Sequence, residues 1–163
     1  DPEPVAAVRP LLDTIGRATF HLGPLGCGNV GKLVNSLLAF SATWASIEGL
    51  ALAARNDIDL RTLLDMVRTG GASNFYMDRL VEGIEAQERP TTFALELAAK
   101  DAGLMVEVGR QAAVPLPLAS AVLQVLVLAG GLGLGGRDYA DLPRVMERVA
   151  DLEFRLRPPD PSD

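Results

Sequence analysis

Apolar residues with helical spacing, separated by glycine and proline, recur along most of this chain. Val5, Val8, Leu12 and Ile15 follow one another at intervals of three or four, which predicts an amphipathic helix over residues 4–15. Similar patterns predict later helices, most of them behind a residue that can cap a first turn. The first of these helices is expected over about 60–69, preceded by the cap Asp59, and the second from Ser73 or Asn74 to about 88. The next are expected over 93–113, preceded by Thr91 or Thr92, over 118–129, and over 142–154, preceded by Asp141.

The longest apolar run predicts a helix from about Cys27 or Asn29 to about Asn56, and residues 33–47 within it carry no charge. A helix that is apolar on all sides must be covered on all sides. One domain of 163 residues has few elements to do this. We therefore expect a homodimer or higher homo-oligomer, or a partner domain that packs on this helix.

Composition supports a helical fold. Leu and Ala dominate a hydrophobic fraction of 48%, whereas aromatic residues make up only 5%. This mixture favours helices packed on helices over a β-sandwich. We predict an all-α domain, with several helices around a long apolar central helix, over residues 1–155. The residues that follow, 156–163, are rich in proline and are expected to be a disordered tail.

Residues 111–136 contain no charged residue, which raises the question of a membrane span. Pro115 and Pro117 interrupt the start of this segment, and a cluster of glycines interrupts its end. The uninterrupted part, 118–129, would be roughly 18 Å long at 1.5 Å per residue, which is too short for a bilayer. We predict a fully buried helix, either central to the domain or covered by a second subunit, and no membrane insertion.

Charge and cysteine content narrow the function classes. The net charge is −6 without a basic stripe, which argues against a nucleic-acid surface. A single cysteine excludes an internal disulfide and fits a reducing compartment, so we expect a cytoplasmic protein. Cys and His pairs that would bind a metal are missing. No signal peptide is visible, and because the chain begins at Asp1 rather than Met, we expect a processed product, an expressed fragment or an excised part of something longer.

The stretch Gly23-x-x-Gly26-x-Gly28-x-x-x-Lys32-x-x-Asn35 holds the residues best suited to chemistry. Glycines allow the backbone to approach a ligand closely. Lys32 and Asn35 are three residues apart, so they share one face of a helix that begins here. An ammonium beside an apolar helix is poorly hydrated, which favours the neutral amine and proton transfer near neutral pH. The alternative is a loop of turn glycines beside a solvated lysine.

This spacing resembles the catalytic signature of the β-hydroxyacid dehydrogenases, the family that includes 3-hydroxyisobutyrate dehydrogenase and tartronate semialdehyde reductase. About 65 residues later, Lys100-Asp101-Ala102-Gly103-Leu104 resembles the Lys-Asp-Leu segment on the cofactor side of that family, and Phe93 matches an aromatic residue two turns earlier. The resemblance covers residues 15–145. It corresponds to the C-terminal helical domain of the family, which is similar to that of 6-phosphogluconate dehydrogenase.

The resemblance implies an NAD(P)-dependent oxidoreductase that transfers hydride between a nicotinamide cofactor and a small 3-hydroxy acid or its semialdehyde. It implies that Lys32 is the general acid/base and that Asn35 and Gly28 bind substrate. Lys100 and Phe93 would contact the cofactor. That cofactor, NAD or NADP, would be held mainly by an N-terminal Rossmann domain absent from this chain. The chain alone is therefore expected to be inactive.

Two departures from the family pattern bear on the substrate and on cofactor contacts rather than on the reaction class. Ser36 stands where the family commonly has a second asparagine, and Ala102-Gly103 replaces bulkier apolar residues. Two other functions are considered: a non-catalytic helical dimerisation module, and a relative that reduces imines. Lys32 with Asn35 argues against the first, and Lys32 alone against the second, because imine-reducing relatives usually replace that lysine.

The remaining candidates have simpler interpretations. Gly26-x-Gly28-x-x-Gly31 fits the dinucleotide fingerprint, but no parallel strands follow it. His21 is expected to be structural or exposed, and Cys27 has no well-placed histidine to activate it. By spacing, Lys100 would form a surface pair with Glu96, and Asp138 would be structural or capping.

Overall fold

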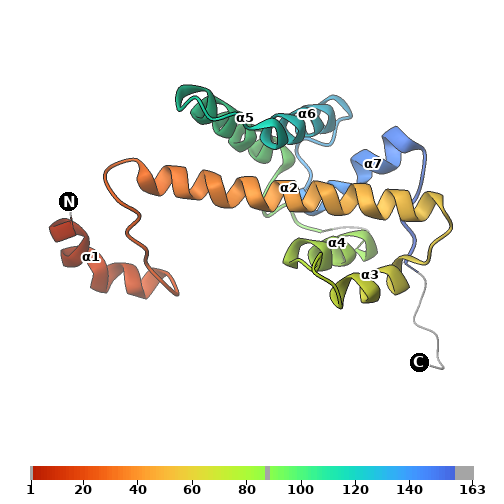
Figure 1. Cartoon of the computed structure of the whole chain (residues 1–163), viewed down its shortest axis with the longest axis horizontal. Coiled ribbons are helices and arrows are strands. Elements are labelled where there is room, and N and C mark those ends of the chain that lie inside the picture. Colours follow the sequence, from red (N-terminus) through yellow and green to blue (C-terminus); the bar gives the residue numbers. More distant parts are fainter. Residues whose placement is uncertain (1, 87–88, 157–163) are drawn as a thin grey trace.

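The computed structural model describes residues 2–86 and 89–156. Within these residues the chain forms seven α-helices and one 3-10 turn, and the β-pairing is limited to one isolated bridge between Ala94 and Asp138. The fold is all-α, as predicted (Figure 1). In chain order the elements are α1 (Pro2–Ile15), α2 (Cys27–Arg55), α3 (Leu60–Arg68), α4 (Phe75–Glu85), α5 (Leu95–Gln111), α6 (Pro117–Gly131), η1 (Tyr139–Asp141) and α7 (Pro143–Ala150).

The 29-residue helix α2 is the axis of the molecule (Figure 1). Helices α5 and α6 pack together on one side of α2, and helices α3 and α4 lie on the other side. Helix α7 contacts α2, α4 and α6. Ile47 and Leu50 of α2 are almost fully buried between these layers. Burial of such side chains supplies the main driving force for the fold. Their largest equally buried partners on other elements are Leu95, Leu126, Leu142 and Val145.

Local signals placed most helix starts correctly. Asp59 caps α3 by accepting a hydrogen bond from the Thr62 amide at 2.9 Å, and Asn74 caps α4 by accepting one from Met77 at 3.0 Å. The predicted cap of α5 was wrong. Thr92 donates to the Asp138 carboxylate instead, and α5 begins at Leu95 without a side-chain cap.

The predicted last helix was too long. Helix α7 starts at Pro143 and ends at Ala150, because Asp151 adopts a left-handed conformation with φ of 47° that stops the helix. Asp141 lies in the preceding 3-10 turn and pairs with Arg137 and Arg144 rather than capping α7. Of the predicted tail, residues 157–163 lie outside the described residues.

Within the single chain helix α6 is buried on one side only, so it is not central to the domain, and its predicted cover by a second subunit stays a prediction. One of its faces, which includes Val122 and Leu126, lies in the core, but Leu118 and Val127 are 65% and 56% exposed. Helix α2 is long and apolar enough to cross a membrane, yet it contacts helices α3 to α7. We interpret α2 as the core helix of a multi-helix domain.

Helix α1 stands apart from the other helices (Figure 1). Its residues Leu11 and Ile15 are 64% and 78% exposed, and Phe20 in the following non-helical segment is 80% exposed. An amphipathic helix whose apolar side is uncovered indicates a surface that contacts something else. The segment over 17–22 that follows α1 forms neither a helix nor a strand.

Gly83 on α4 tests the packing against η1. A Cβ at this position would lie 2.8 Å from the Ala140 carbonyl oxygen, whereas a Cβ at Gly103 on α5 would meet nothing within 4 Å. Gly83→Ala is expected to destabilise the protein by about 1–3 kcal/mol through overpacking. Gly103→Ala, the matched control, should stabilise it by about 0.5–1 kcal/mol through helix propensity. Urea denaturation of both variants measures this, and equal effects would contradict the close packing.

Candidate functional site

The glycine-rich segment of the motif shapes the start of α2. Gly23 and Gly26 adopt φ values of 132° and 96°, a left-handed region that other residues rarely enter. Gly26 is the residue that precedes the helix, and Lys32 therefore lies in the second turn of α2. Gly28, one turn before Lys32, is exposed, and a Cβ there would meet nothing within 4 Å. The helix face that leads to Lys32 is open.

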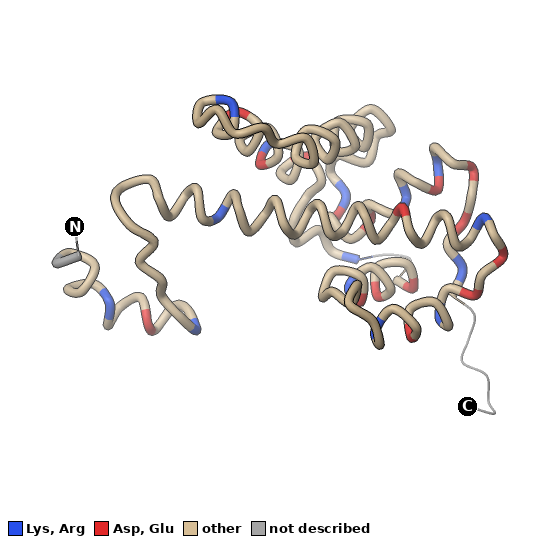
Figure 2. Tube along the Cα trace, in the orientation of Figure 1, with Lys and Arg blue, Asp and Glu red and all other residues tan. Residues whose placement is uncertain are grey.

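Lys32 forms an ion pair across the α2–α5 interface. Its Nζ donates a hydrogen bond to Oδ2 of Asp101, and Nζ of Lys100 lies 3.3 Å from Oδ1 of the same carboxylate. The Asp101 side chain is only 6% exposed, whereas the side chains of Lys32 and Lys100 are 57% and 63% exposed. One buried carboxylate thus holds two lysines that remain accessible. Figure 2 shows one isolated basic position in the N-terminal half of α2, and the sequence of that half contains a single Lys or Arg, Lys32.

The charge state of Asp101 follows from these contacts. Burial by itself would raise the pKa of this carboxyl. The hydrogen bonds from Lys32 and Lys100 lower the pKa by more than burial raises it, so the pKa of Asp101 lies below its ordinary value. Asp101 is therefore an anion near neutral pH. It can orient the Lys32 ammonium but not supply a proton itself.

A groove of about 390 Å³ lies between α2, α4 and the segments before α5 and around η1, and its lining does not include Lys32 or Asp101. Asn35, one turn beyond Lys32, lines the groove, as does Phe93. The structure thus places Asn35 and Phe93 at one cavity and joins Lys32 with Lys100 through Asp101. Its other lining residues are mostly aromatic or apolar and include Phe40, Phe75, Tyr76, Arg79, Leu80, Thr92, Asp138 and Tyr139.

An aromatic cluster forms the floor of the groove. The ring of Phe40 lies 5.1 Å from that of Tyr139 and 6.3 Å from that of Phe93, between ring centroids. Burial raises the pKa of Tyr139 far above its usual value, so its phenol stays neutral. The floor can therefore contact an apolar or planar ligand without adding charge.

Asp138 fixes the segment that carries Phe93. Its carboxylate accepts hydrogen bonds from the amides of Thr92, Phe93 and Ala140 at 2.7, 3.2 and 3.0 Å and from the Thr92 hydroxyl at 2.8 Å. The predicted structural or capping role of Asp138 is confirmed. Burial would raise the pKa of Asp138, but these amide donors lower it to about 2.

The hydrogen bonds that the Asp138 carboxylate accepts from Thr92, Phe93 and Ala140, here called the Asp138 clamp, predict a loss of stability in acid. A carboxyl whose pKa is lower in the folded than in the unfolded state stabilises the fold above its ordinary pKa of 3.8, and this contribution is lost as the pH falls toward 2. The loss for Asp138 should be roughly 2 kcal/mol. Asp138→Asn should remove that pH dependence and destabilise the protein at pH 7, as measured by urea denaturation at pH 7, 4 and 2.5.

Glu107 provides the control for Asp138. Hydrogen bonds from Arg110 and Gln111 also lower the pKa of Glu107 to about 2, but this group lies at the surface. Water screens such pairs, so Glu107→Gln should change the pH dependence of stability much less. An unchanged acid transition in Asp138→Asn would contradict the role of the clamp.

The other candidate residues lie outside these contacts. His21 is exposed, as expected, and Cys27 is a half-buried free thiol at the start of α2. Lys100 pairs with Asp101 rather than with Glu96, the partner that spacing predicted. Among the described residues, no group of three His, Cys, Asp or Glu side chains is arranged to hold a metal ion.

Asp101 is the member of the candidate site that the sequence did not indicate, since it belongs to the Lys-Asp segment but its spacing alone suggests no role. The signal was nevertheless present, because Asp101 lies on the same stripe of α5 as Ala98 and Met105, which are buried. A carboxylate on the apolar face of a helix needs a cationic partner. Its partner from another helix is Lys32, 69 positions earlier.

These features define a class: a helical domain in which a lysine near the start of a long central helix pairs with a buried aspartate, and an asparagine one turn later lines an aromatic groove. Residues 26–146 match the family model described as "NAD-binding of NADP-dependent 3-hydroxyisobutyrate dehydrogenase". The chain belongs to this family, and the predicted resemblance to the β-hydroxyacid dehydrogenases is confirmed.

Individual relatives agree with this assignment. The chain is 32% identical over 154 residues to L-threonate dehydrogenase of Pectobacterium atrosepticum, covering 93% of this chain and 50% of that protein. It is 28% identical over 143 residues to 2-(hydroxymethyl)glutarate dehydrogenase of Eubacterium barkeri, covering 87% and 48%. The crystal structure of 3-hydroxyisobutyrate dehydrogenase from Salmonella typhimurium matches with a TM-score of 0.77 at 25% identity and covers 86% of this chain and 50% of that one. The chain thus spans about half the length of these relatives.

Proposed function

We propose that this chain is the substrate-binding and catalytic half of an NAD(P)-dependent dehydrogenase. The complete enzyme would oxidise a small 3-hydroxy acid to its semialdehyde or catalyse the reverse reaction. The observation that carries this proposal is the accessible Lys32 ammonium, which buried Asp101 holds one turn before Asn35, and Asn35 lines a groove together with Phe93. The printed activities of the relatives, which are dehydrogenases of hydroxy acids, support the same reaction class.

In this proposal Lys32 moves the proton. In the reduction direction the Lys32 ammonium donates a proton to the oxygen that forms the hydroxyl, and in the oxidation direction the neutral amine accepts it. Asn35 donates or accepts a hydrogen bond with the substrate hydroxyl or carboxylate, and the open backbone at Gly28 admits the substrate. Asp101 contacts neither substrate nor cofactor. It positions the Lys32 nitrogen.

The groove and the exposed lysine suit a nicotinamide cofactor. Phe93 offers an aromatic surface at the groove, and Lys100 keeps 63% of its side chain exposed, so it can contact a polar group. When bound, NAD or NADP would accept or donate the hydride. Phe93 and Lys100 would contact its nicotinamide end, and most of its binding energy would come from a Rossmann domain elsewhere in the natural polypeptide.

The exposed apolar surfaces support a partner domain and self-association. Leu11 and Ile15 of α1 are uncovered, and so are Val30, Val34 and Leu38, which lie four residues apart along one side of α2. We propose that the Rossmann domain covers α1 and that the side of α2 contributes to a homodimer or higher oligomer. We also propose a cytoplasmic location, in keeping with the single free cysteine.

An assay of the full natural polypeptide tests the proposal. The protein is incubated with NAD or NADP and a panel of 3-hydroxy acids, and formation of the reduced nicotinamide is followed by absorbance. At least one pair is expected to give turnover, whereas this chain alone should give little. Activity on cyclic imines only would favour an imine-reducing enzyme. Inactivity on all substrates, with intact dimers, would favour a non-catalytic dimerisation module.

A further inference from the structure

A cationic side chain, that of Arg79, lines the aromatic groove together with Asn35. Arg79 projects from α4, on the opposite side of α2 from α5, whereas Asn35 comes from α2 itself. The aromatic rings of Phe75, Tyr76 and Phe93 line the same groove. A ligand that enters it therefore meets an amide and a guanidinium from two different helices, with an apolar surface along the groove.

The positive charge of Arg79 is not neutralised by a close carboxylate among the described residues. Among the described residues its acidic partner is Glu82, with 3.7 Å between Arg79 Nε and Glu82 Oε2, which is longer than a hydrogen bond. The guanidinium carbon lies 5.8 Å from the centroid of the Phe75 ring, a cation–π contact that leaves the N–H edges open. The Arg79 side chain is 64% exposed.

Asp138, the other charged residue that lines the groove, cannot compete for a ligand. It is 7% exposed, and its oxygens accept hydrogen bonds from the amides of Thr92, Phe93 and Ala140. Arg79 is therefore the available charge among the described residues that line the groove. A guanidinium binds a carboxylate with two parallel hydrogen bonds, which no other side chain does as well.

We propose that Arg79 determines specificity by binding a second carboxylate, so that the preferred substrate is a 3-hydroxy acid, or its semialdehyde, with a distal anionic group. This inference rests on the proposed function. The reacting hydroxyl end lies near Asn35 and Lys32, the carbon chain lies along the aromatic surface, and the distal carboxylate pairs with Arg79. A groove of about 390 Å³ has room for such a small dianion.

Two matched substrates test this in the full natural polypeptide: 2-(hydroxymethyl)glutarate, and its monoamide, in which the distal carboxylate is a neutral amide of the same shape. The unmodified protein should prefer the diacid by about 10- to 100-fold in kcat/KM. Arg79→Ala should lose this preference through a higher KM for the diacid, with kcat and the KM for the monoamide little changed. Arg79→Lys should restore part of it, because lysine keeps the charge but not the two parallel donors.

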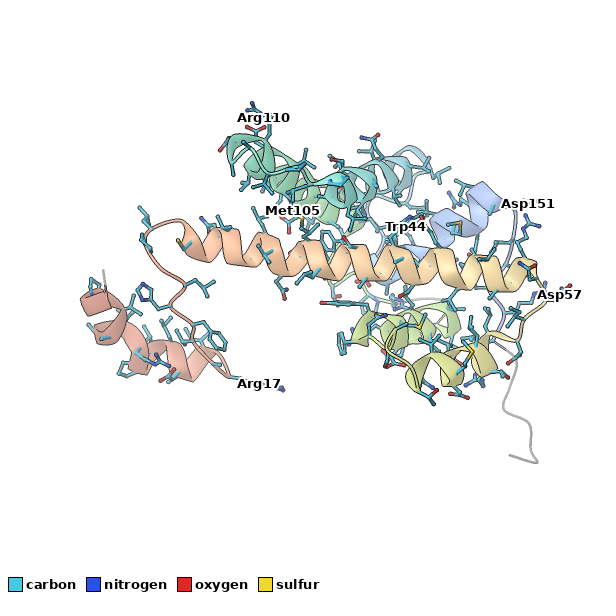
Figure 3. All side chains as sticks on the ribbon, in the orientation of Figure 1. Arg17, Trp44, Asp57, Met105, Arg110 and Asp151 are labelled. Atoms are coloured by element: carbon cyan, nitrogen blue, oxygen red, sulfur yellow. The ribbon has the colours of Figure 1, made fainter. Side chains whose placement is uncertain are left out.

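Arg110→Ala is the control variant. Arg110 also forms an i,i+3 pair, with Glu107, but lies at the far end of α5 from the groove (Figure 3). Arg110→Ala should leave kcat/KM for both the diacid and the monoamide unchanged. Equal kcat/KM for diacid and monoamide in the unmodified protein would overturn the role of Arg79 and leave the proposed function standing. An increase in the KM of NAD(P), rather than of the diacid, in Arg79→Ala would also overturn that role alone. Turnover of neither substrate, nor of any other hydroxy acid, would overturn both.

Discussion

Replacing Lys32 by alanine in the full natural polypeptide is expected to lower kcat by about 10²- to 10⁴-fold, the range for loss of a general acid/base. Dinucleotide binding should persist, because Lys32, near the start of α2, would act on the substrate, and most of the cofactor-binding residues would belong to another domain. The measurements are steady-state kinetics and a titration of NAD(P) followed by fluorescence. The side chain is 57% exposed, so its removal should not unfold the protein.

Lys32→Arg separates proton transfer from charge. Arginine would keep a positive charge beside Asp101 but does not release its proton in proteins. It should therefore be nearly as inactive as alanine. Near-normal turnover of Lys32→Ala would refute the assignment, and near-normal turnover of Lys32→Arg would show that only a charge is needed at this position.

Asp101→Asn is expected to lower kcat by about 10²-fold, with a smaller effect on the KM of the cofactor. The variant has the same shape but no charge, so Lys32 and Lys100 lose the carboxylate that they share. A displacement of the reacting nitrogen by about 1 Å can cost this much in rate. Two ammonium groups without an anion between them also repel each other.

Asp141→Asn is the matched control for Asp101. Asp141 is also a buried carboxylate between two cations, Arg137 and Arg144, with side-chain N–O distances of 2.8 and 3.0 Å. Asp141 belongs to η1. Its partner Arg137 precedes η1 and its partner Arg144 lies on α7, so neither shares helix α2 with Lys32. Both variants should lower the midpoint of thermal unfolding, but only Asp101→Asn should lower kcat. Equal losses of kcat would mean that Asp101 acts through stability alone.

The sequence predicted the helices because each depends on local rules. The long apolar run placed α2, and Asp59 and Asn74 acted as the caps of α3 and α4, as expected. The errors arose where a distant residue changed a local preference. Thr92 failed as a cap because Asp138, 46 positions later, accepts its hydrogen bonds.

The site was predictable only in part. The spacing of Lys32 and Asn35 placed them on one face of α2, but the groove beside Asn35 is built from segments that meet only in the folded chain. The pairing of Lys32 with Asp101 has the same origin, because it joins α2 to α5. Arg79 was not predicted, since its spacing to the motif residues carries no periodic signal.

The lysine–aspartate–lysine arrangement has an electrostatic consequence. Two ammonium groups and one carboxylate carry a local charge of about +1, in a chain whose net charge is −6. At physiological ionic strength, fields from exposed charges fade over about 8 Å. The acidic residues elsewhere on the chain therefore contribute little to the electrostatic potential at Lys32 and Lys100. An approaching phosphate or carboxylate meets a positive potential only in the last few ångströms. Long-range attraction would contribute little to its capture, and short-range contact would contribute most.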